Sequence, residues 1–504
     1  MRPVSDRVSN IAHFLTRNAR RLGAEPAVIV GDQVTDWATL DARVSALAFV
    51  LRTECGVGFG DRVLVQAVNS RACVEVMLAC FRLGAVWCPC NWRLTPAEVA
   101  GQARVAGARL FVCDDGFGAH RAAVGGQVLS TDYEGRIAPY LGRGMANADV
   151  GRDDPCWLFF TSGSTGRPKG VVLTQGQLTF TILNHLNDLM PGITHRDRSL
   201  VVAPLSHGAG MHLLTQLAVG AGSVILEGAF DAGAVWAAIG RHGIGNMFTV
   251  PTIVKRIVEH PEARGDTTLR HVIYAGAPMY AEDQRVALEV LGPVLVQYYG
   301  LGEVTGAITV LRPEDHTAAR AGSCGVERTG MEVRIMDEAG VALPVGETGE
   351  VCVAGPAVCA GYWENDAANR EAFRDGWFRT GDIGHMDAEG YLYLTGRRSD
   401  MFITGGSNVH PREVEEVLLT HPDVAEVAVI GVPDRDLGEV GWAVVVARRE
   451  VGEGAILGWL EGRVAGYKRP RRVLFVAEIP KSGYGKVTRA LVRQLIESMG
   501  LWPV

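Results

Sequence analysis

A stretch rich in hydroxyls and glycines, residues 160–170 (FTSGSTGRPKG), separates two apolar runs of this sequence. The flanking runs, 156–160 and 171–173, are typical of strands, so the stretch is predicted to be a strand-to-strand turn. Backbone N–H groups and hydroxyls in such a turn can converge on an anion, and Lys169 adds a positive charge. These properties indicate a phosphate-binding loop.

The loop differs from the Walker P-loop, which has a glycine directly before its lysine and a helix after it. Here Pro168 precedes Lys169, and a strand pattern follows. A plain surface turn is the alternative for the fragment SGSTG taken alone. The attached Pro168-Lys169-Gly170 favours phosphate binding.

Residues 161–170 resemble the signature loop of the adenylate-forming superfamily, which includes acyl-CoA synthetases, luciferases and peptide-synthetase adenylation domains. The resemblance implies that this loop binds the phosphates of ATP. The residues it assigns to that contact are Thr161, Ser162, Gly163, Ser164, Thr165, Gly166 and Lys169.

Composition places the chain among soluble globular proteins, because 47% of its 504 residues are apolar and 21% are charged. A net charge of -7 argues against a nucleic-acid binder. The ten cysteines contain no Cys-x-x-Cys pair, which favours reduced thiols in a cytoplasmic protein. Residues 1–10 carry charges without an apolar core, and 211–226 are too short and too interrupted to span a bilayer, so neither a signal peptide nor a membrane segment is expected.

Strand and helix patterns alternate along most of the chain, which predicts parallel β-α-β units with helices on both sheet faces. The expected helices are 9–22, 41–51, 73–83 and 95–105, and the expected strands are 62–68, 85–90, 109–113, 199–202, 223–226, 245–249 and 272–274. From 326 to 394 no helix is expected, and short β segments recur with turns at 337–340 and 387–390. A new α+β pattern follows, with helices at 411–419 and after Glu453 and strands at 424–430 and 442–447.

The predicted fold class is therefore α/β, in two domains. Residues 1–397 form a large N-terminal AMP-binding domain of layered α/β subdomains plus a β-rich subdomain. Residues 398–504 form a small α+β C-terminal domain, which the resemblance implies is a mobile lid.

Three further motifs resemble the nucleotide site of the superfamily. In Tyr299-Gly-Leu-Gly-Glu303 the tyrosine is expected to stack on adenine and Glu303 to bind Mg²⁺; a core tyrosine and a surface carboxylate are the alternatives. The family threonine is replaced by Gly302, so one hydroxyl contact to phosphate is missing; Thr305 is nearby, and restoring the threonine should raise the rate if that hydroxyl limits it. Gly276, Ala277 and Pro278 resemble the segment at the adenine edge.

The ribose motif is expected at Thr380-Gly381-Asp382, because a carboxylate can accept hydrogen bonds from both sugar hydroxyls. Arg397, fifteen residues later, matches the family arginine that also reaches the ribose. Taken alone, Thr-Gly-Asp is a common turn. Its spacing to Arg397 favours the functional interpretation.

Besides Glu303, two more catalytic residues are implied by resemblance. His207 lies in a segment that stands between the carboxylate and the thiol entry, although a lone histidine after a strand is often structural. Lys486 matches the lysine that bridges the acyl carboxylate and the α-phosphate, where a cation stabilises the transition state. Lys481 lies close enough to be mistaken for it.

The second substrate is expected to be coenzyme A. The resemblance assigns its binding to Gly405, Gly406, Tyr467, Arg469 and Arg471, and it places the hinge of the lid at Ser399. A solvated basic turn is the alternative for 467–472. No carrier-protein domain is expected after Thr488, which disfavours a built-in peptide-synthetase module.

The acid is predicted to be a medium-chain fatty or an aromatic acid. Its pocket is implied to contain small residues and no charge, and no acidic residue near His207 would hold an amino group. The residues are Asn184, His207, Gly208, Ala209, Gly276, Tyr298, Gly300 and Thr305.

The resemblance thus implies an AMP-forming acid–CoA ligase that uses ATP, Mg²⁺ and coenzyme A. A ligase that passes acyl-AMP to a separate carrier protein and a catalytically degenerate nucleotide-binding protein remain as alternatives. An α/β-hydrolase is excluded, because the sequence contains no Gly-x-Ser-x-Gly. The sequence does not determine the oligomeric state, and a homodimer is one option.

Overall fold

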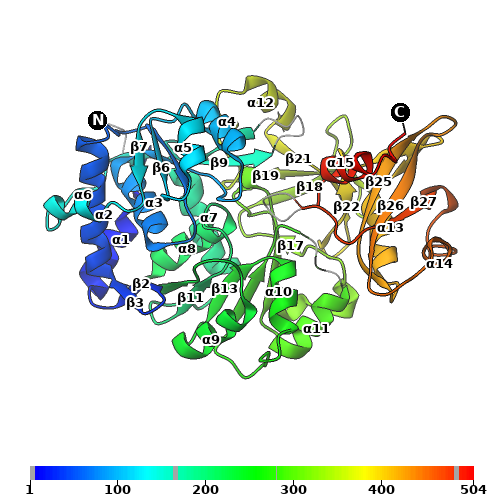
Figure 1. The fold of residues 1–504 in the computed structure, drawn as a ribbon, viewed down its shortest axis with the longest axis horizontal. Helices are drawn as coiled ribbons and strands as arrows, with labels where there is room; N and C mark the ends of the chain where they lie inside the picture. Colours follow the sequence, from blue (N-terminus) through cyan, green and yellow to red (C-terminus); the bar gives the residue numbers. More distant parts are fainter. Residues whose placement is uncertain (1–5, 163–167, 278, 280, 482–486, 504) are drawn as a thin grey trace. The chain divides into compact units, whose positions relative to one another are not determined.

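The structure is a computed structural model that describes residues 6–162, 168–277, 279, 281–481 and 487–503 (Figure 1). Strands and helices alternate through its first part, as the sequence predicts. The helices are α1 His13–Leu22, α2 Trp37–Thr53, α3 Arg71–Leu83, α4 Pro96–Ala106, α5 Gly118–Val124, α6 Glu134–Ile137, α7 Gln175–Asp188, α8 Gly208–Val219, α9 Ala232–His242, α10 Pro251–Val258, α11 Ala281–Leu291, α12 Asp366–Ala372, α13 Pro411–Leu419, α14 Glu453–Trp459 and α15 Arg489–Ser498.

The largest sheet is mixed and has the order β17-β16-β15-β14-β13-β11-β12-β2-β3. Strands β15, β14, β13, β11, β12 and β2 are parallel to one another. The bounds are β2 Pro26–Val30, β3 Gln33–Asp36, β11 Arg198–Val201, β12 Gly222–Ile225, β13 Asn246–Thr249, β14 His271–Tyr274, β15 Leu295–Tyr299, β16 Thr309–Leu311 and β17 Val326–Glu327.

Both faces of this sheet are buried, because successive side chains of a strand point to opposite sides. In β11, Leu200 packs with helices α9, α10 and α11, while its neighbour Val201 joins a core that includes α7 and α8. In β15, Leu295 packs on the side of α9, α10 and α11, whereas Val296 packs in the core that includes α7 and α8. The expectation of parallel strands covered by helices on both faces is confirmed.

A second sheet has the order β10-β9-β5-β4-β6-β7 and contributes one face to the same core as α7 and α8. Its strands are β4 Arg62–Gln66, β5 Val86–Pro89, β6 Leu110–Cys113, β7 Val128–Ser130, β9 Pro155–Ser162 and β10 Pro168–Thr174, and a small pair joins β1 Arg7–Val8 to β8 Val150–Gly151. Trp157 of β9 is fully buried edge-on against Trp87 of β5, with ring centroids 4.4 Å apart. Thr174, at the end of β10, caps α7 in a capping box with Gln177. The hairpin β9–β10 is therefore anchored at its base.

Two more sheets follow. The first has the order β18-β19-β21-β20 with β22 paired to β21, and the second has the order β24-β23-β26-β25 with β27 paired to β26. Their strands are β18 Glu332–Met336, β19 Gly349–Ala354, β20 Phe373–Arg374, β21 Trp377–Met386, β22 Leu392–Arg397, β23 Phe402–Thr404, β24 Ser407–Val409, β25 Val424–Asp434, β26 Gly438–Ala447 and β27 Arg472–Phe475. The turns at 337–340 and 387–390 are present, each closed by a glycine N–H that donates to the aspartate carbonyl.

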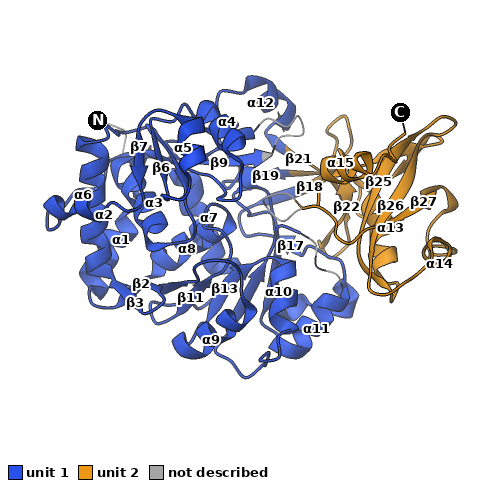
Figure 2. Cartoon of the chain, viewed as in Figure 1, with its two compact units in different colours: residues 1–333, 353–378 blue, residues 334–352, 379–504 orange. Residues whose placement is uncertain are grey.

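The chain forms two compact units (Figure 2). One comprises 1–333 and 353–378, and the other comprises 334–352 and 379–504. The sequence-based boundary between 397 and 398 rests on the change to an α+β pattern at that point, and it stays a prediction.

One detail of the sequence-based fold is wrong, because the region 326–394 contains helix α12. The side chain of Asn365 accepts a hydrogen bond from the Ala368 N–H at 3.1 Å and so begins the helix. All ten cysteines are free and buried. Within the described residues, no helix is both long and apolar enough to cross a membrane.

Candidate functional site

The predicted phosphate loop lies between the antiparallel strands β9 and β10, so the strands expected on either side of it are confirmed. Lys169 lies opposite Thr161 in the register of this hairpin. Gly163, Ser164, Thr165 and Gly166 lie outside the described residues, and only the backbone of Ser162 is described.

Glu303 joins this hairpin to the loop after β15. Thr161 Oγ1 donates to Glu303 Oε1 at 3.4 Å, and the hydroxyl of Tyr362 donates to the same oxygen at 3.0 Å. Among the described residues nothing donates to the other carboxylate oxygen, Oε2. A carboxylate oxygen is a ligand that Mg²⁺ prefers, so Glu303 fits the predicted metal role.

Tyr362 is a residue that the sequence analysis missed. Its ring centroid lies 5.0 Å from Lys169 Nζ, and its hydroxyl is held by Glu303. Burial and then the charge of Glu303 raise the pKa of Tyr362, so the phenol stays protonated and acts as the donor. It thereby positions both the cation and the carboxylate of the site.

The segment that carries Tyr362 is tied to β10 by backbone hydrogen bonds. The N–H of Trp363 donates to Gly170 O at 2.7 Å, and the N–H of Val172 donates to Gly361 O at 2.9 Å. Cys359 N–H donates to Glu303 O at 2.7 Å. No local motif marks this segment, because its role arises from contacts with two distant parts of the chain.

Three predicted residues follow the carboxyl ends of parallel strands. His207 comes after β11, Gly276 after β14, and Tyr299 ends β15. Carboxyl ends of neighbouring parallel strands meet at one edge of a sheet, where ligands bind in open α/β folds. The structure therefore brings the predicted histidine, adenine-edge and aromatic positions to the same edge; Ala277 is exposed there, and Pro278 lies outside the described residues.

His207 also approaches the phosphate hairpin. Its Nδ1 lies 2.8 Å from Ser206 Oγ, and its ring meets Phe159 of β9 edge-on, with centroids 5.3 Å apart. His207 therefore contacts the strand that leads into the phosphate loop.

The space beside Gly302 is filled by Phe159. A Cβ built on Gly302 would lie 2.6 Å from the Phe159 ring and 3.3 Å from the methyl carbon of Thr161. The ring therefore occupies the volume that a threonine side chain would need. This contact changes the expectation drawn from the sequence, because restoring the threonine alone would force the Phe159 ring to move.

Thr305 does not supply the missing hydroxyl. Its Oγ1 donates to Ala357 O at 2.9 Å and lies 2.8 Å from Thr181 Oγ1, which must then be the donor in that pair. Thr305 is buried in a left-handed backbone conformation with φ 49°. Its hydroxyl holds the loop to α7 instead of facing a phosphate.

The residues predicted to form the acyl pocket lie on several elements around β15. Gly208 and Ala209 begin α8, and a Cβ on Gly300 would lie 2.5 Å from the backbone of Gly306, so a close backbone approach requires the glycine. Tyr298 and Asn184 are buried. The set itself contains no charged residue, but the buried guanidinium of Arg328 lies 5.8 Å from the Tyr298 ring centroid.

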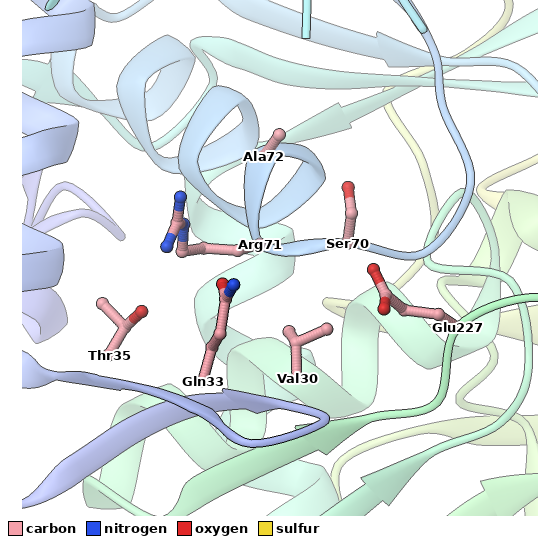
Figure 3. Close-up of a pocket in the computed structure, with 7 residues that line it drawn as sticks. All are labelled: Val30, Gln33, Thr35, Ser70, Arg71, Ala72 and Glu227. Atoms are coloured by element: carbon pink, nitrogen blue, oxygen red, sulfur yellow. The ribbon is translucent and has the colours of Figure 1, made fainter. Parts of the chain in front are cut away.

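A separate pocket of about 190 Å³ contains none of the predicted residues (Figure 3). It is lined by Val30, Gln33, Thr35, Ser70, Arg71, Ala72 and Glu227. Arg71 is paired with Glu75 at 3.1 Å and Glu134 at 2.8 Å, and Ser70 caps α3. These groups have structural partners, so the pocket is not assigned a function.

In the second compact unit, Asp382 and Arg397 face each other across β21 and β22. Arg397 Nε lies 3.0 Å from Asp382 Oδ1, so the predicted ribose pair is brought together. Met386 faces Leu392 and Gly384 faces Leu394, but Ile383 faces Gly396. Thr395 is thus an extra residue of β22, a bulge that places Arg397 opposite Asp382.

Gly405 and Gly406 form the turn between β23 and β24, with φ of 54° and 82°. Thr404 pairs with Ser407 on either side, so the two-residue hairpin itself requires left-handed residues. The turn explains both glycines, and their predicted contact with coenzyme A stays a prediction. Ser399, the predicted hinge, donates from Oγ to Asp400 at 3.2 Å.

The side chains of the basic turn 467–472 differ in their exposure and in their partners. Arg469 is paired with Glu461 at 3.2 Å, and Lys468 is paired with Glu413, whereas Tyr467 and Arg471 are exposed. Lys486 lies outside the described residues. Lys481 is paired with Glu426 at 2.9 Å, so its charge is already matched.

The sequence is similar to those of known enzymes. The sequence matches the AMP-binding enzyme family over residues 15–363 and its C-terminal domain over 413–486. Feruloyl-CoA synthase of an Amycolatopsis species is 38% identical over 97% of this chain and 99% of that protein, and indoleacetate–CoA ligase of Aromatoleum aromaticum is 34% identical over 95% and 97%.

Solved enzyme structures are also similar to this chain. The o-succinylbenzoate CoA synthetase of Bacillus subtilis, solved with its acyl-adenylate, has a TM-score of 0.88 at 30% identity, covering 97% of this chain and 98% of that chain. The same enzyme solved with ATP and a magnesium ion has a TM-score of 0.85 at 30% identity, covering 95% and 99%.

The three strand-edge positions, the hairpin and the family match together identify an adenylate-forming enzyme. The chain belongs to the AMP-binding enzyme family, within its acid–CoA ligase branch. The family and the fold class predicted from the sequence are confirmed, whereas the roles of individual site residues stay predictions.

The hydrogen bond from Tyr362 to Glu303 should support metal binding. Tyr362→Phe keeps the ring beside Lys169 but leaves Glu303 with one donor fewer, so we expect adenylation to need roughly 10–100-fold more Mg²⁺. Pyrophosphate exchange measured over a Mg²⁺ titration checks this. Tyr133→Phe is the matched control, because that buried tyrosine donates to Glu75 at 2.8 Å; an equal shift in both variants would contradict the proposed role.

Gly302→Thr should lower the adenylation rate, because its Cβ would overlap the Phe159 ring. In the double variant Phe159→Leu/Gly302→Thr, the smaller leucine side chain leaves room for the threonine. Much of the lost adenylation rate should therefore return. Rates and melting temperatures of both single variants and the double variant test the coupling, expected at about 0.5–3 kcal/mol. A rate gain in Gly302→Thr alone would show that Phe159 moves freely.

Proposed function

We propose that this enzyme joins an aromatic carboxylic acid to coenzyme A through an acyl-adenylate, with ATP as the source of AMP. Acid–CoA ligation with an aromatic or a fatty acid is the activity of its branch of the family. The narrower choice of an aromatic acid is supported by the ring-rich surroundings of the predicted acyl residues. The names of the relatives that act on ferulate and indoleacetate point the same way.

The observation that carries this choice is a set of rings beside Gly208 and Tyr298. Phe248 lies under the start of α8, where a Cβ on Gly208 would approach its ring to 2.6 Å. The rings of Phe248 and Tyr298 are 6.0 Å apart with an interplanar angle of 24°, and His212 stacks on Phe248 at 4.5 Å. Flat rings with few rotatable bonds suit a planar substrate better than a flexible chain.

In the first half-reaction, the acid's carboxylate attacks the α-phosphorus of ATP, and the bond to pyrophosphate breaks. Lys169, held against the face of Tyr362, is placed on the hairpin to offset the negative charge of the leaving pyrophosphate. Glu303 would hold Mg²⁺, which when bound supplies charge neutralisation to the phosphates. In the second half-reaction, the thiol of coenzyme A attacks the acyl carbon and AMP leaves.

The remaining assignments rest on the family pattern. Asp382 and Arg397 are proposed to bind the ribose, and the exposed Tyr467 and Arg471 to bind coenzyme A, with Arg469 beside them. Cytoplasmic location, which the free and buried cysteines support, and a homodimer stay predictions.

An AMP-release assay with ATP, Mg²⁺ and a panel of acids tests the function. We expect release that requires both acid and coenzyme A, with kcat/KM at least roughly tenfold higher for aromatic acids than for fatty acids of equal carbon number. A preference for fatty acids would contradict the aromatic proposal. Acid-dependent pyrophosphate exchange without any dependence of AMP release on coenzyme A would favour a carrier-protein acceptor.

Lys486→Ala should lower acyl-AMP formation by roughly two to three orders of magnitude, because a preorganised charge at the reacting oxygens is lost. Thioester formation from supplied acyl-AMP should survive. Lys481→Ala is the matched control, since its charge is paired with Glu426. Equal losses in both half-reactions of Lys486→Ala would contradict its assignment.

A further inference from the structure

A buried group of polar and aromatic side chains lies next to the predicted acyl residues. We call it the inner polar cluster, and its members come from α7, α8, β15 and the chain after β17. At least nine-tenths of each residue is buried. The members are Asn184, His185, His212, Tyr298 and Arg328.

The cluster adjoins the acyl residues through shared contacts. Tyr298, itself a predicted acyl residue, has its ring centroid 6.0 Å from both His185 and His212. His212 lies one helical turn after Gly208 on α8. Thr181, one turn before His185 on α7, bonds the hydroxyl of Thr305. The cluster therefore belongs to the surroundings of the acid and not of the nucleotide.

His185 presents a hydrogen-bond donor without a partner. Its Nδ1 lies 2.9 Å from a guanidinium nitrogen of Arg328, which can only donate, so Nδ1 is the acceptor. Burial, then Arg328 and His212, lower the pKa of His185 well below its usual value, so the ring is neutral and carries its proton on Nε2. No described residue accepts from this buried Nε2–H.

His212 and Asn184 add further unmatched groups. Both ring nitrogens of His212 are buried without a described hydrogen-bond partner, and burial lowers its pKa to about 3, so the neutral ring offers one donor and one acceptor. The amide nitrogen of Asn184 donates to Asp188 and to Thr329 O, but its buried Oδ1 has no described donor. Unmatched buried polar atoms are costly, which indicates a polar group that joins them.

The buried cation of the cluster, Arg328, already has a carboxylate partner in Asp188, which the more exposed Arg312 also approaches to 3.7 Å. Arg328 Nε lies 3.8 Å from Asp188 Oδ2, and that carboxylate also accepts from the Thr329 N–H at 2.8 Å. Burial lowers the pKa of Arg328 to about 10, which leaves it charged at neutral pH and paired with Asp188. A second carboxylate on the substrate would therefore be buried without a free cation to match it.

We propose that the substrate is an aromatic acid bearing an uncharged hydroxyl-type group at the end remote from its carboxylate, and that His212 and His185 bind this group. A hydroxyl can both donate and accept, which matches the unpaired atoms of the two rings. This inference rests on the proposed function and specifies the acid that the same site selects. His185 and His212 then act as specificity-determining residues.

Matched acids test the proposal on the intact enzyme. Para-hydroxyl, para-methyl and para-carboxyl forms of benzoic, phenylacetic and 3-phenylpropenoic acid are compared by AMP release with coenzyme A. In the best series, kcat/KM for the hydroxyl acid should exceed those of the methyl and carboxyl forms by roughly 100-fold or more, because a site built for a hydroxyl rejects analogues that leave its groups unpaired. Equal values, or a preference for methyl or carboxyl, would overturn the proposal and indicate that water alone fills the cluster.

Substitutions of His212 test whether this residue causes the preference for the hydroxyl acid. His212→Phe should lower kcat/KM for the hydroxyl acid roughly 10–100-fold and leave that for the methyl acid within a few-fold, whereas His212→Gln, which keeps a donor and an acceptor, should retain part of the preference. His271→Phe is the matched control, because His271 is another buried histidine with an unpartnered Nδ1, at the opposite end of β14 from the site. Loss of preference in His271→Phe as well would overturn the assignment.

The proposed function can fail separately. If no acid in the panel supports AMP release with coenzyme A, the ligase proposal is wrong. If several acids support release but the hydroxyl forms have no advantage, only the inference about the inner polar cluster is wrong.

Discussion

A single carboxylate oxygen, Oε1 of Glu303, connects three distant segments of this chain. It accepts from Thr161 on the phosphate hairpin and from Tyr362 on the segment after β19, and it belongs to the loop after β15. Hydrogen bonds to a charged acceptor are stronger than neutral ones, so this shared acceptor holds the segments in register. The other oxygen has no donor among the described residues and is the one that we propose holds Mg²⁺. Glu303 is therefore a structural junction, whatever it binds.

Much of the architecture follows from local signals. The helix at Pro411–Leu419 and the strand that begins at Val424 lie where apolar periodicity and flanking turn residues place them. The hairpin β9–β10 was predictable because strand patterns flank the glycine-rich loop. Helix α12 was missed because its seven residues contain few apolar side chains, and its start depends on the cap at Asn365.

The unpredicted parts of the site share another cause. Tyr362 has no motif around it, and its role depends on two partners far away in sequence. His212, which we propose binds the acid, lies in an apolar helix, where a lone histidine resembles an ordinary core residue. In the sequence Phe159 is an ordinary strand residue, and its role depends on the contact between its ring and the space beside Gly302. Such roles arise from tertiary contacts, which spacing along a single sequence does not encode.

The bulge at Thr395 gives the spacing between Asp382 and Arg397 a geometric meaning. Side chains on a strand alternate between faces, so one residue more or fewer exchanges the face that each presents. If Thr395 paired with Ile383 in a regular ladder without a bulge, Gly396 would replace Arg397 as the position opposite Asp382. In any relative that keeps the same strand pairing and turn, the number of residues between these two motifs therefore reports whether the bulge is present. The number of residues near a turn usually varies freely, but here it decides which residue lies opposite Asp382 across the strand pair.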